Sequence, residues 1–260
     1  MIVEKIIPIA REAGKLMVRS GFDVMEKDTS ANLVTSSDLA VQQFLVGRLA
    51  EILPDAGFFC EENDFGDLNH EYVWIIDPID GTANYARGID HCSVSIALAK
   101  GGEVIAGVVY SPWRNELFHA EKGSGAFLNG SPIKASDRPL KEGLFCTAMS
   151  TYRKEFAKIC SDIIYAIYMR SNDVRRFGSA AIELCMVASG QIELFFEMRL
   201  QPWDYAAASL ILAEAGGVSC GFDGCPMSLS NPSLTLAANN QENLSELLST
   251  VRRHLPELPY

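Results

Sequence analysis

The sequence predicts an α+β protein in which layers of helix and sheet alternate along two successive halves of the chain. Three observations favour this class. Apolar residues recur with helical period at the start of the chain, a strand-rich stretch with short connections follows, and helical period returns beyond about residue 150. Short connections between consecutive strands indicate antiparallel pairing, so the first half is not expected to be doubly wound.

Two amphipathic helices are expected before the first strands. Residues 2 to about 20 carry apolar side chains at helical spacing, and Gly21 ends this pattern. A second helix carries apolar residues at helical spacing between residues 41 and 52 and closes at Pro54. Its start at residues 35–38 resembles a capping box, which would fix the first turn.

The remaining elements follow from changes in period and from turn residues. Strands are expected at 74–76 and then at SVSIALA, EVIAGVVYS, ELFHAEK and GAFLNG, with a turn at Gly101 and Gly102. Helices are expected at about 153–169, 179–188 and 204–215, strands at IELFFEM, VSCGF and SLTLAAN, and a final helix at QENLSELLSTVRRHL. We expect a single domain over residues 1–260 with halves at about 1–140 and 141–260, divided near 139–143.

Composition limits the classes of function. The 260 residues are 48% hydrophobic and 21% charged, which is ordinary for a globular enzyme. With 22 basic against 33 acidic residues the net charge is −11, so nucleic acid is not expected as the main partner. An acidic protein that acts on a phosphorylated small molecule needs a cation at its site, and a divalent metal ion is the simplest candidate.

Cysteine usage and hydropathy bear on the compartment. The seven cysteines are odd in number and form no CxxC pair, so they are expected to be reduced, mostly buried thiols of a cytoplasmic protein. The first residues mix charges with apolar positions, and no apolar run reaches about 18 residues. We therefore expect a protein that is neither exported nor inserted into a membrane.

The segment WIIDPIDGTANY at 74–85 has the composition of a site for metal and phosphate together. Asp77 and Asp80 supply hard carboxylate oxygens, and Pro78 between them stiffens the loop because its ring fixes φ. Gly81 lets the backbone approach a ligand, and Thr82 adds a hydroxyl and an amide. Taken alone, the same residues are equally compatible with a plain turn at the end of a strand.

Further acidic residues stand where such a site would need them, each with a second interpretation. Glu61 leaves a strand-like apolar pair first and is a ligand candidate, whereas Glu62 is expected to lie in a solvated loop. Asp204 precedes an apolar helix, so it is either an N-cap worth about 1 kcal/mol or a metal ligand. Asp38 is either the acid of the capping box or the partner of a catalytic hydroxyl. Lys27 is expected to be solvated, with the mouth of an active site as the alternative.

Taken together, these residues resemble the inositol monophosphatase family of magnesium-dependent, lithium-sensitive sugar phosphatases. The signature WIDPIDGTxNF resembles residues 74–85, with Tyr85 in place of Phe, and WDxAAxxxIxxEAGG resembles residues 203–217. Shorter blocks are similar at 34–38 (VTxxD), at 60–63 (the acidic block, with Cys60 where a small residue is common) and at 178–181 (GSAA). The blocks stand in family order along nearly the whole chain.

The resemblance implies a fold and a set of metal ligands. The fold would be a layered αβαβα sandwich with mixed, largely antiparallel sheets. Glu61, Asp77 and the carbonyl of Ile79 would bind one Mg²⁺, and Asp77 would bridge to a second ion held by Asp80 and Asp204. A weaker third ion near Glu61 would bring the total to two or three per subunit.

The resemblance also implies how substrate and water would be held. Thr82 and Asp38 would orient the attacking water, with Glu61 and Asp77 completing the catalytic set, and the amides of Gly81 and Thr82 would bind phosphate oxygens. Substrate contacts would also come from the remaining rim and ligand residues, namely Asp80, Ser179, Ala180, Glu197 and Asp204.

The expected activity is hydrolysis of inositol monophosphate or a similar small polyol phosphate, by direct attack of water at a two-metal site. The resemblance further implies a homodimer. Fructose-1,6-bisphosphatase, histidinol-phosphate phosphatase and 3′-phosphoadenosine phosphatase are alternatives on the same scaffold, and Arg175 and Arg176 are candidates for a second phosphate, although structural roles are favoured for them. From another class, the chain could be a regulatory or scaffold protein that keeps the fold without turnover.

Overall fold

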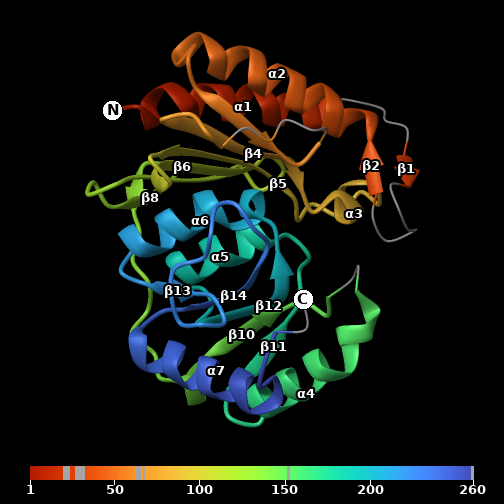
Figure 1. Cartoon of the computed structure of the whole chain (residues 1–260), viewed down its shortest axis with the longest axis vertical. Coiled ribbons are helices and arrows are strands. Elements are labelled where there is room, and N and C mark those ends of the chain that lie inside the picture. The colour runs from red at the N-terminus through yellow and green to blue at the C-terminus, as the bar shows by residue number, and fades with distance from the viewer. Residues whose placement is uncertain (20–23, 27–32, 63–65, 67, 151–152, 259–260) are drawn as a thin grey trace.

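In the computed structural model the chain forms five alternating layers of helix and sheet, which confirms the αβαβα prediction (Figure 1). The structure describes residues 1–19, 24–26, 33–62, 66, 68–150 and 153–258. A seven-stranded and a five-stranded sheet lie between three helical layers. In order these layers are α1 (Val3–Arg19) with α2 (Ser36–Ile52), then α5 (Ala180–Ala188) with α6 (Pro202–Glu214), and finally α4 (Ala157–Tyr168) with α7 (Gln241–His254).

The outer pair of helices matches the predicted periodicity. Helix α1 buries Ile6, Ala10 and Met17 against the first sheet and α2, which explains the spacing of its apolar residues. The capping box at the start of α2 is confirmed, because the Thr35 and Asp38 side chains each accept the other residue's backbone amide. Helix α2 ends two residues before Pro54, as a proline stop predicts.

The first sheet follows chain order and is largely antiparallel. Its strands are β3 (Gly57–Cys60), β4 (Tyr72–Asp80), β5 (Ser93–Lys100), β6 (Glu103–Ser111), β7 (Glu116–Glu121), β8 (Ala126–Leu128) and β9 (Ser131–Pro132). Only the β3–β4 pair among these is parallel. The expected strand at 74–76 is longer than predicted and runs through Asp80. Its ladder with β5 is irregular between Asp77 and Asp80, where Pro78 has no amide to donate.

The second sheet mixes the two directions. Its order is β11 (Asp173–Arg175), β10 (Leu144–Thr147), β12 (Leu194–Leu200), β14 (Ser233–Ala238) and β13 (Val218–Cys220). Strand β10 pairs in parallel with both neighbours, whereas β14 is antiparallel to β12 and β13. Strands β10 and β11 were not predicted, because strands of four and three residues are too short to show a period. A 3-10 turn (Lys154–Phe156) precedes α4, so this helix begins later than the predicted residue 153.

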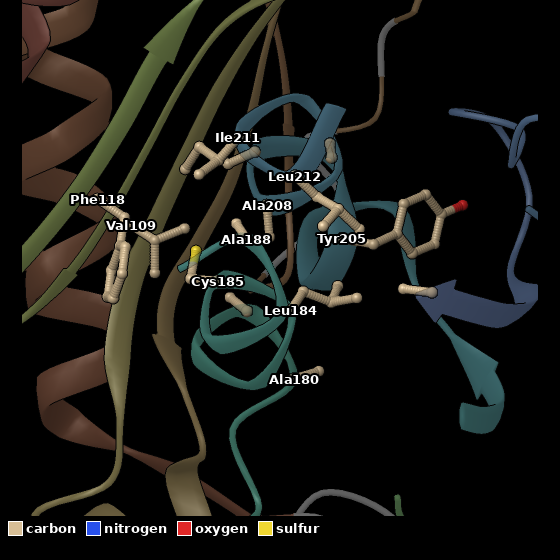
Figure 2. Close-up of a cluster of buried hydrophobic side chains, with 14 of the residues drawn as sticks. Val109, Phe118, Ala180, Leu184, Cys185, Ala188, Tyr205, Ala208, Ile211 and Leu212 are labelled. Carbon is tan, nitrogen blue, oxygen red and sulfur yellow. The ribbon is translucent and has the colours of Figure 1, made fainter. Parts of the chain in front are cut away.

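The central helices α5 and α6 are covered by a sheet on each side, and small side chains allow the close packing. Figure 2 shows Cys185 and Ala188 of α5 near Ala208 of α6, with Val109 and Phe118 of the first sheet on the side of Cys185. At Gly107 of β6 a Cβ atom would lie 2.7 Å from the carbonyl oxygen of Ala207. Helix α6 therefore lies directly on the first sheet, and this brings its first turn to the end of β4.

Cysteine burial agrees with the sequence analysis: all seven cysteines are free thiols, six are buried and Cys225 is exposed. Within the residues that the structure describes, none of the helices combines the length and the apolar character that crossing a bilayer would require. Two further short strands, β1 (Val24–Glu26) and β2 (Leu33–Thr35), pair with each other next to α2. The division of the chain into two halves near residue 140 stays a prediction.

Candidate active site

The end of strand β4 places two carboxylates in the interior. Asp77 is 1% exposed and Asp80 is 7% exposed. The amide of Ile79 donates to Asp77 Oδ1 at 2.9 Å, so the carboxylate of Asp77 spans the proline and fixes the local bend. Ile79 itself is fully buried. The motif is therefore more than a surface turn, because its charged groups point into the protein.

A third carboxylate reaches the same place from a distant segment. Oxygen atoms of Asp77, Asp80 and Asp204 all lie within 4.8 Å of one another. Asp204 is the third residue of α6 and not its N-cap, which corrects one of the two predicted readings; Gln201 occupies the cap position. The Gln201 amide donates to Asp204 Oδ2 at 2.7 Å, so the start of the helix orients the carboxylate.

The electrostatics of this cluster favour a cation. Withdrawal from water, followed by the charges of Glu61 and Asp80, raises the pKa of Asp77 well above its usual range. Burial and the charges of Asp80 and Glu61 raise the pKa of Asp204 in the same way. Several buried carboxylates this close together oppose each other's ionisation, and a divalent ion would relieve that cost. The all-oxygen donor set fits a hard divalent ion such as Mg²⁺.

The two glutamates after β3 differ from each other in a way the sequence did not predict. Glu61 is half-buried, and its amide donates to the carbonyl of Ile76 on β4 at 3.1 Å. Glu62, expected in a solvated loop, is only 4% exposed. Its backbone is bound on both sides by Gln42 of α2: the amide donates to Gln42 Oε1 at 3.0 Å, and the carbonyl accepts from Gln42 Nε2. The prediction was wrong because that partner lies 20 residues away on a helix.

Asp80 also closes the start of α5. Its carboxylate accepts from the Ser179 hydroxyl at 2.5 Å and from the amides of Ala180 at 3.2 Å and Ala181 at 2.8 Å. Burial raises the pKa of Asp80 to about 6, and the Ser179 and Ala181 donors oppose that rise. Ser179 and Ala180, predicted at the substrate rim, are thus donors to a carboxylate of the cluster.

Thr82 stands at the start of the four-residue helix α3 (Thr82–Tyr85). Its hydroxyl oxygen lies 3.0 Å from the carbonyl oxygen of Ile79 and 3.3 Å from Asp38 Oδ1. Asp38 is fully buried, and its other oxygen caps α2. The Tyr85 hydroxyl bonds the Met17 carbonyl at 3.0 Å and Ser37 Oγ at 2.9 Å, which fixes α3 on both outer helices.

Gly81 has φ +91°, a conformation that favours glycine. A Cβ atom there would lie 3.0 Å from the Gly178 carbonyl oxygen and 3.1 Å from the His91 carbonyl oxygen. The glycine was expected to let the backbone approach a ligand; in the structure it also lets the protein's own backbone come close. Asn84 was not predicted as a site residue, although it lies inside the 74–85 motif; its side-chain amide donates to the carbonyls of His91 at 2.8 Å and Phe177 at 2.7 Å.

The predicted rim residues are spread over the second sheet and the loop before α5. Glu197 of β12 is half-buried, and withdrawal from water, with the charges of Glu183 and Asp80, raises its pKa to about 8, opposed by Arg176. Arg175 bonds Asp173 at 2.5 Å, so it is engaged on its own strand. Arg176 is exposed. Lys27 lies outside the described residues.

A cavity of about 520 Å³ lies elsewhere, on the side of α6 next to β13 and the β5–β6 turn. Its lining includes Tyr205, Ser209 and Met227 but none of the clustered carboxylates. The candidate site is therefore located by the convergence of buried acids and not by this cavity.

Comparison with known proteins agrees with this geometry. A profile described as the inositol monophosphatase family matches residues 3–255. Nus factor SuhB of Xylella fastidiosa is 36% identical over 228 residues, which cover 85% of this chain and 82% of that protein. The Thermotoga maritima IMPase TM1415 superposes with a TM-score of 0.87 at 31% identity and covers 98% of both chains. SaIMPase-II of Staphylococcus aureus, solved with inositol monophosphate bound, gives a TM-score of 0.83 at 29% identity over 97% of this chain and 95% of that one.

Proposed function

Because this chain belongs to the inositol monophosphatase family, we propose that it is a Mg²⁺-dependent phosphomonoesterase that hydrolyses inositol monophosphate or a similar small polyol phosphate. The observation that carries the proposal is the convergence of Asp77, Asp80 and Asp204, whose oxygens lie within 4.8 Å of one another. Burial raises the pKa of all three acids, and repulsion by neighbouring carboxylates of the site adds to the rise at Asp77 and Asp204, so the cluster is suited to a divalent cation.

The ligand set proposed for the metal follows the resemblance. Glu61, Asp77 and the Ile79 carbonyl would hold one ion, and Asp80 and Asp204 would hold a second, with Asp77 between the two. When bound, such ions acidify a water and stabilise the charge on the departing oxygen. The charges of Glu61 and Asp204 both raise the pKa of Asp77, which supports a shared site for these residues.

The chain's own residues would orient the reactants. In the proposal the Thr82 hydroxyl oxygen accepts a hydrogen bond from the attacking water while the hydroxyl hydrogen is donated to Asp38, and the 3.3 Å separation of Thr82 and Asp38 supports the pairing. The Gly81 and Thr82 amides would bind phosphate oxygens. Burial raises the pKa of Glu197 to about 8, so its carboxyl group would stay protonated near neutral pH. The protonated carboxyl group would then donate a hydrogen bond to a substrate hydroxyl.

The test is release of phosphate from a panel of monoesters by the wild-type protein and Asp77→Asn. The panel holds inositol monophosphate, fructose 1,6-bisphosphate, histidinol phosphate and 3′-phosphoadenosine phosphate, each with and without Mg²⁺ and Li⁺. We expect hydrolysis of a small polyol phosphate that requires Mg²⁺, falls with Li⁺ and drops by several orders of magnitude in Asp77→Asn. Normal Mg²⁺-dependent turnover by that variant would refute the ligand assignment.

A second candidate role is that of a regulatory or scaffold protein. It is favoured by the relative called Nus factor SuhB, which is named as a factor and not as an enzyme. Absence of hydrolysis of every ester on the panel by a folded, Mg²⁺-loaded protein would support this role over the first.

Four further expectations belong to the proposal. They are a homodimer, two or three Mg²⁺ ions per subunit, a single domain over residues 1–260, and a cytoplasmic location. Sedimentation at micromolar concentration decides the first, and titration calorimetry with Mg²⁺ counts the ions.

A further inference from the structure

The loop before helix α5 is held from one side by Asn84. Asn84 Nδ2 donates to the carbonyl oxygen of Phe177 at 2.7 Å and to that of His91 at 2.8 Å. A side-chain amide has two hydrogens on this nitrogen, so both are used. The two carbonyls lie 93 and 7 residues away from Asn84, which means that one side chain joins the site segment to the second half of the chain.

The same loop is held from the other side by Glu183. Glu183 Oε1 accepts from the amides of Phe177 at 3.0 Å and Gly178 at 2.6 Å. Glu183 is 2% exposed, and bonds to a buried carboxylate are among the stronger ones in proteins. Asn84 therefore holds this loop through the carbonyl of Phe177, and Glu183 holds it through the amides of Phe177 and Gly178.

Two more contacts hold this loop close to Gly81 and His91. The rings of His91 and Phe177 stack with their centroids 4.9 Å apart. The Gly81 backbone lies so close to Gly178 that a Cβ on Gly81 would be 3.0 Å from the Gly178 carbonyl oxygen. The next three residues, Ser179 to Ala181, are the ones that donate to the Asp80 carboxylate.

We infer that Asn84 is a positioning residue for Asp80. By fixing residues 177 and 178, it sets where the Ser179 hydroxyl and the first amides of α5 lie, and these donors orient the carboxylate. The consequence for metal binding rests on the proposed function, whereas the positioning itself does not. Partners of a ligand commonly change metal affinity by roughly 10–100-fold when they are removed.

The first test uses Asn84→Asp, which keeps the shape but turns an oxygen toward two carbonyls in place of a donor nitrogen. Asn129→Asp is the matched control, since Asn129 Nδ2 also donates to a carbonyl, that of Asn115, at 2.8 Å, and Asn129 lies in the β8–β9 turn, away from the carboxylate cluster in the chain. Asn84→Ala removes both bonds without adding a charge. Circular dichroism verifies that each variant is folded.

Hydrogen exchange at Ala180 and Ala181 gives a readout that needs no metal. These amides open helix α5, where no carbonyl of the helix itself can accept from them, so their protection reports the Asp80 contact. We expect exchange at both amides at least about tenfold faster in the two Asn84 variants and unchanged in Asn129→Asp. Wild-type exchange rates in folded Asn84→Asp and Asn84→Ala would overturn the inference.

Titration calorimetry with Mg²⁺ is the second readout. The dissociation constant is expected to rise by roughly 10–100-fold in Asn84→Ala and to stay at the wild-type value in Asn129→Asp. An Asn84 that only stabilised the fold would lower the melting temperature and leave the Mg²⁺ affinity of the folded protein unchanged. A wild-type protein with protected Ala180 and Ala181 amides but no Mg²⁺-dependent hydrolysis would refute the proposed function and leave the positioning role standing.

Discussion

The hydroxyl oxygen of Thr82 lies 3.3 Å from one carboxylate oxygen of Asp38, and the other oxygen of Asp38 accepts the Thr35 amide at 2.7 Å. A single buried side chain thus closes the start of helix α2 and contacts the hydroxyl beside the carboxylate cluster. The capping-box interpretation of Asp38 is confirmed, and its other oxygen contacts the Thr82 hydroxyl, whose catalytic role stays a prediction. Replacing Thr82 is therefore expected to lower activity with little loss of stability, whereas replacing Asp38 should lower both.

Replacing Thr82 by Val tests the proposed role of the hydroxyl at nearly constant shape. We expect kcat to fall by roughly 10²–10⁴-fold with little change in KM, because the hydroxyl would act on the attacking water and not on bound substrate. Asp38→Ala should lose activity as well, together with about 1 kcal/mol of unfolding free energy from the lost cap. Steady-state kinetics and urea unfolding check both, and an unchanged kcat in Thr82→Val would remove Thr82 from the mechanism.

Metal removal should destabilise the protein near neutral pH. Burial raises the pKa of Asp80 to about 6 and, with the charges of nearby carboxylates, raises that of Asp77 well above its usual range, so the folded state binds more protons than the unfolded chain above about pH 4. The metal-free protein therefore loses stability as pH rises through about 4 to 6 and beyond. At pH 7.5 we expect Mg²⁺ at about 100 times its dissociation constant to raise the free energy of unfolding by about 2.7 kcal/mol. The same Mg²⁺ concentration should raise it clearly less at pH 5.

Calorimetric melting with Mg²⁺ or with EDTA at the two pH values measures this effect, with NaCl matched for ionic strength. Equal melting temperatures with Mg²⁺ and with EDTA at pH 7.5 would contradict a metal site in this cluster.

Gly81→Ala should be more damaging than Gly88→Ala. Both glycines have positive φ, +91° and +69°, so each alanine carries a backbone strain of about 1–3 kcal/mol. A Cβ at Gly88 meets nothing within 4 Å, whereas at Gly81 it meets two carbonyl oxygens at 3.0 and 3.1 Å. We expect Gly81→Ala to cost about 1–2 kcal/mol more in denaturant unfolding, because backbone must shift. Equal costs would mean that the Gly81 contact is relieved without strain.

His91 should make stability depend on pH in the opposite sense. Burial, together with the charge of Arg114, lowers the pKa of His91 from 6.5 to about 4. The contribution of neutral His91 to the free energy of unfolding is complete above about pH 6.5. It is lost as pH falls toward 4, because His91 takes up a proton in the unfolded chain before it does so in the folded protein. We expect wild type to lose about 2 kcal/mol between pH 7.5 and 4 relative to His91→Phe, after allowance for solvent screening. A difference between the two proteins that does not vary with pH would refute this.

The order of layers could be predicted because periodicity and turn chemistry are local properties. The apolar spacing of α1, the capping box of α2 and the antiparallel strands from β4 to β8 all follow from residues near one another in the chain. The missed strands β10 and β11 have four and three residues, and their partners are parallel strands reached only through helices. Pairing of that kind leaves no signal in a short window of sequence.

The sequence by itself determined the chemistry of the carboxylate motif at 77–82, because residue types and close spacing specify hard oxygen ligands beside a permissive backbone. Tertiary structure decided what joins it. Asp204 joins the carboxylate cluster because α6 packs directly on Gly107. Asp80 accepts from the amide of Ala181, 101 residues away on α5. Nearby, Glu62 is buried because Gln42 reaches its backbone from α2. Such contacts depend on the distances between packed layers, and no local pattern of residues encodes those distances.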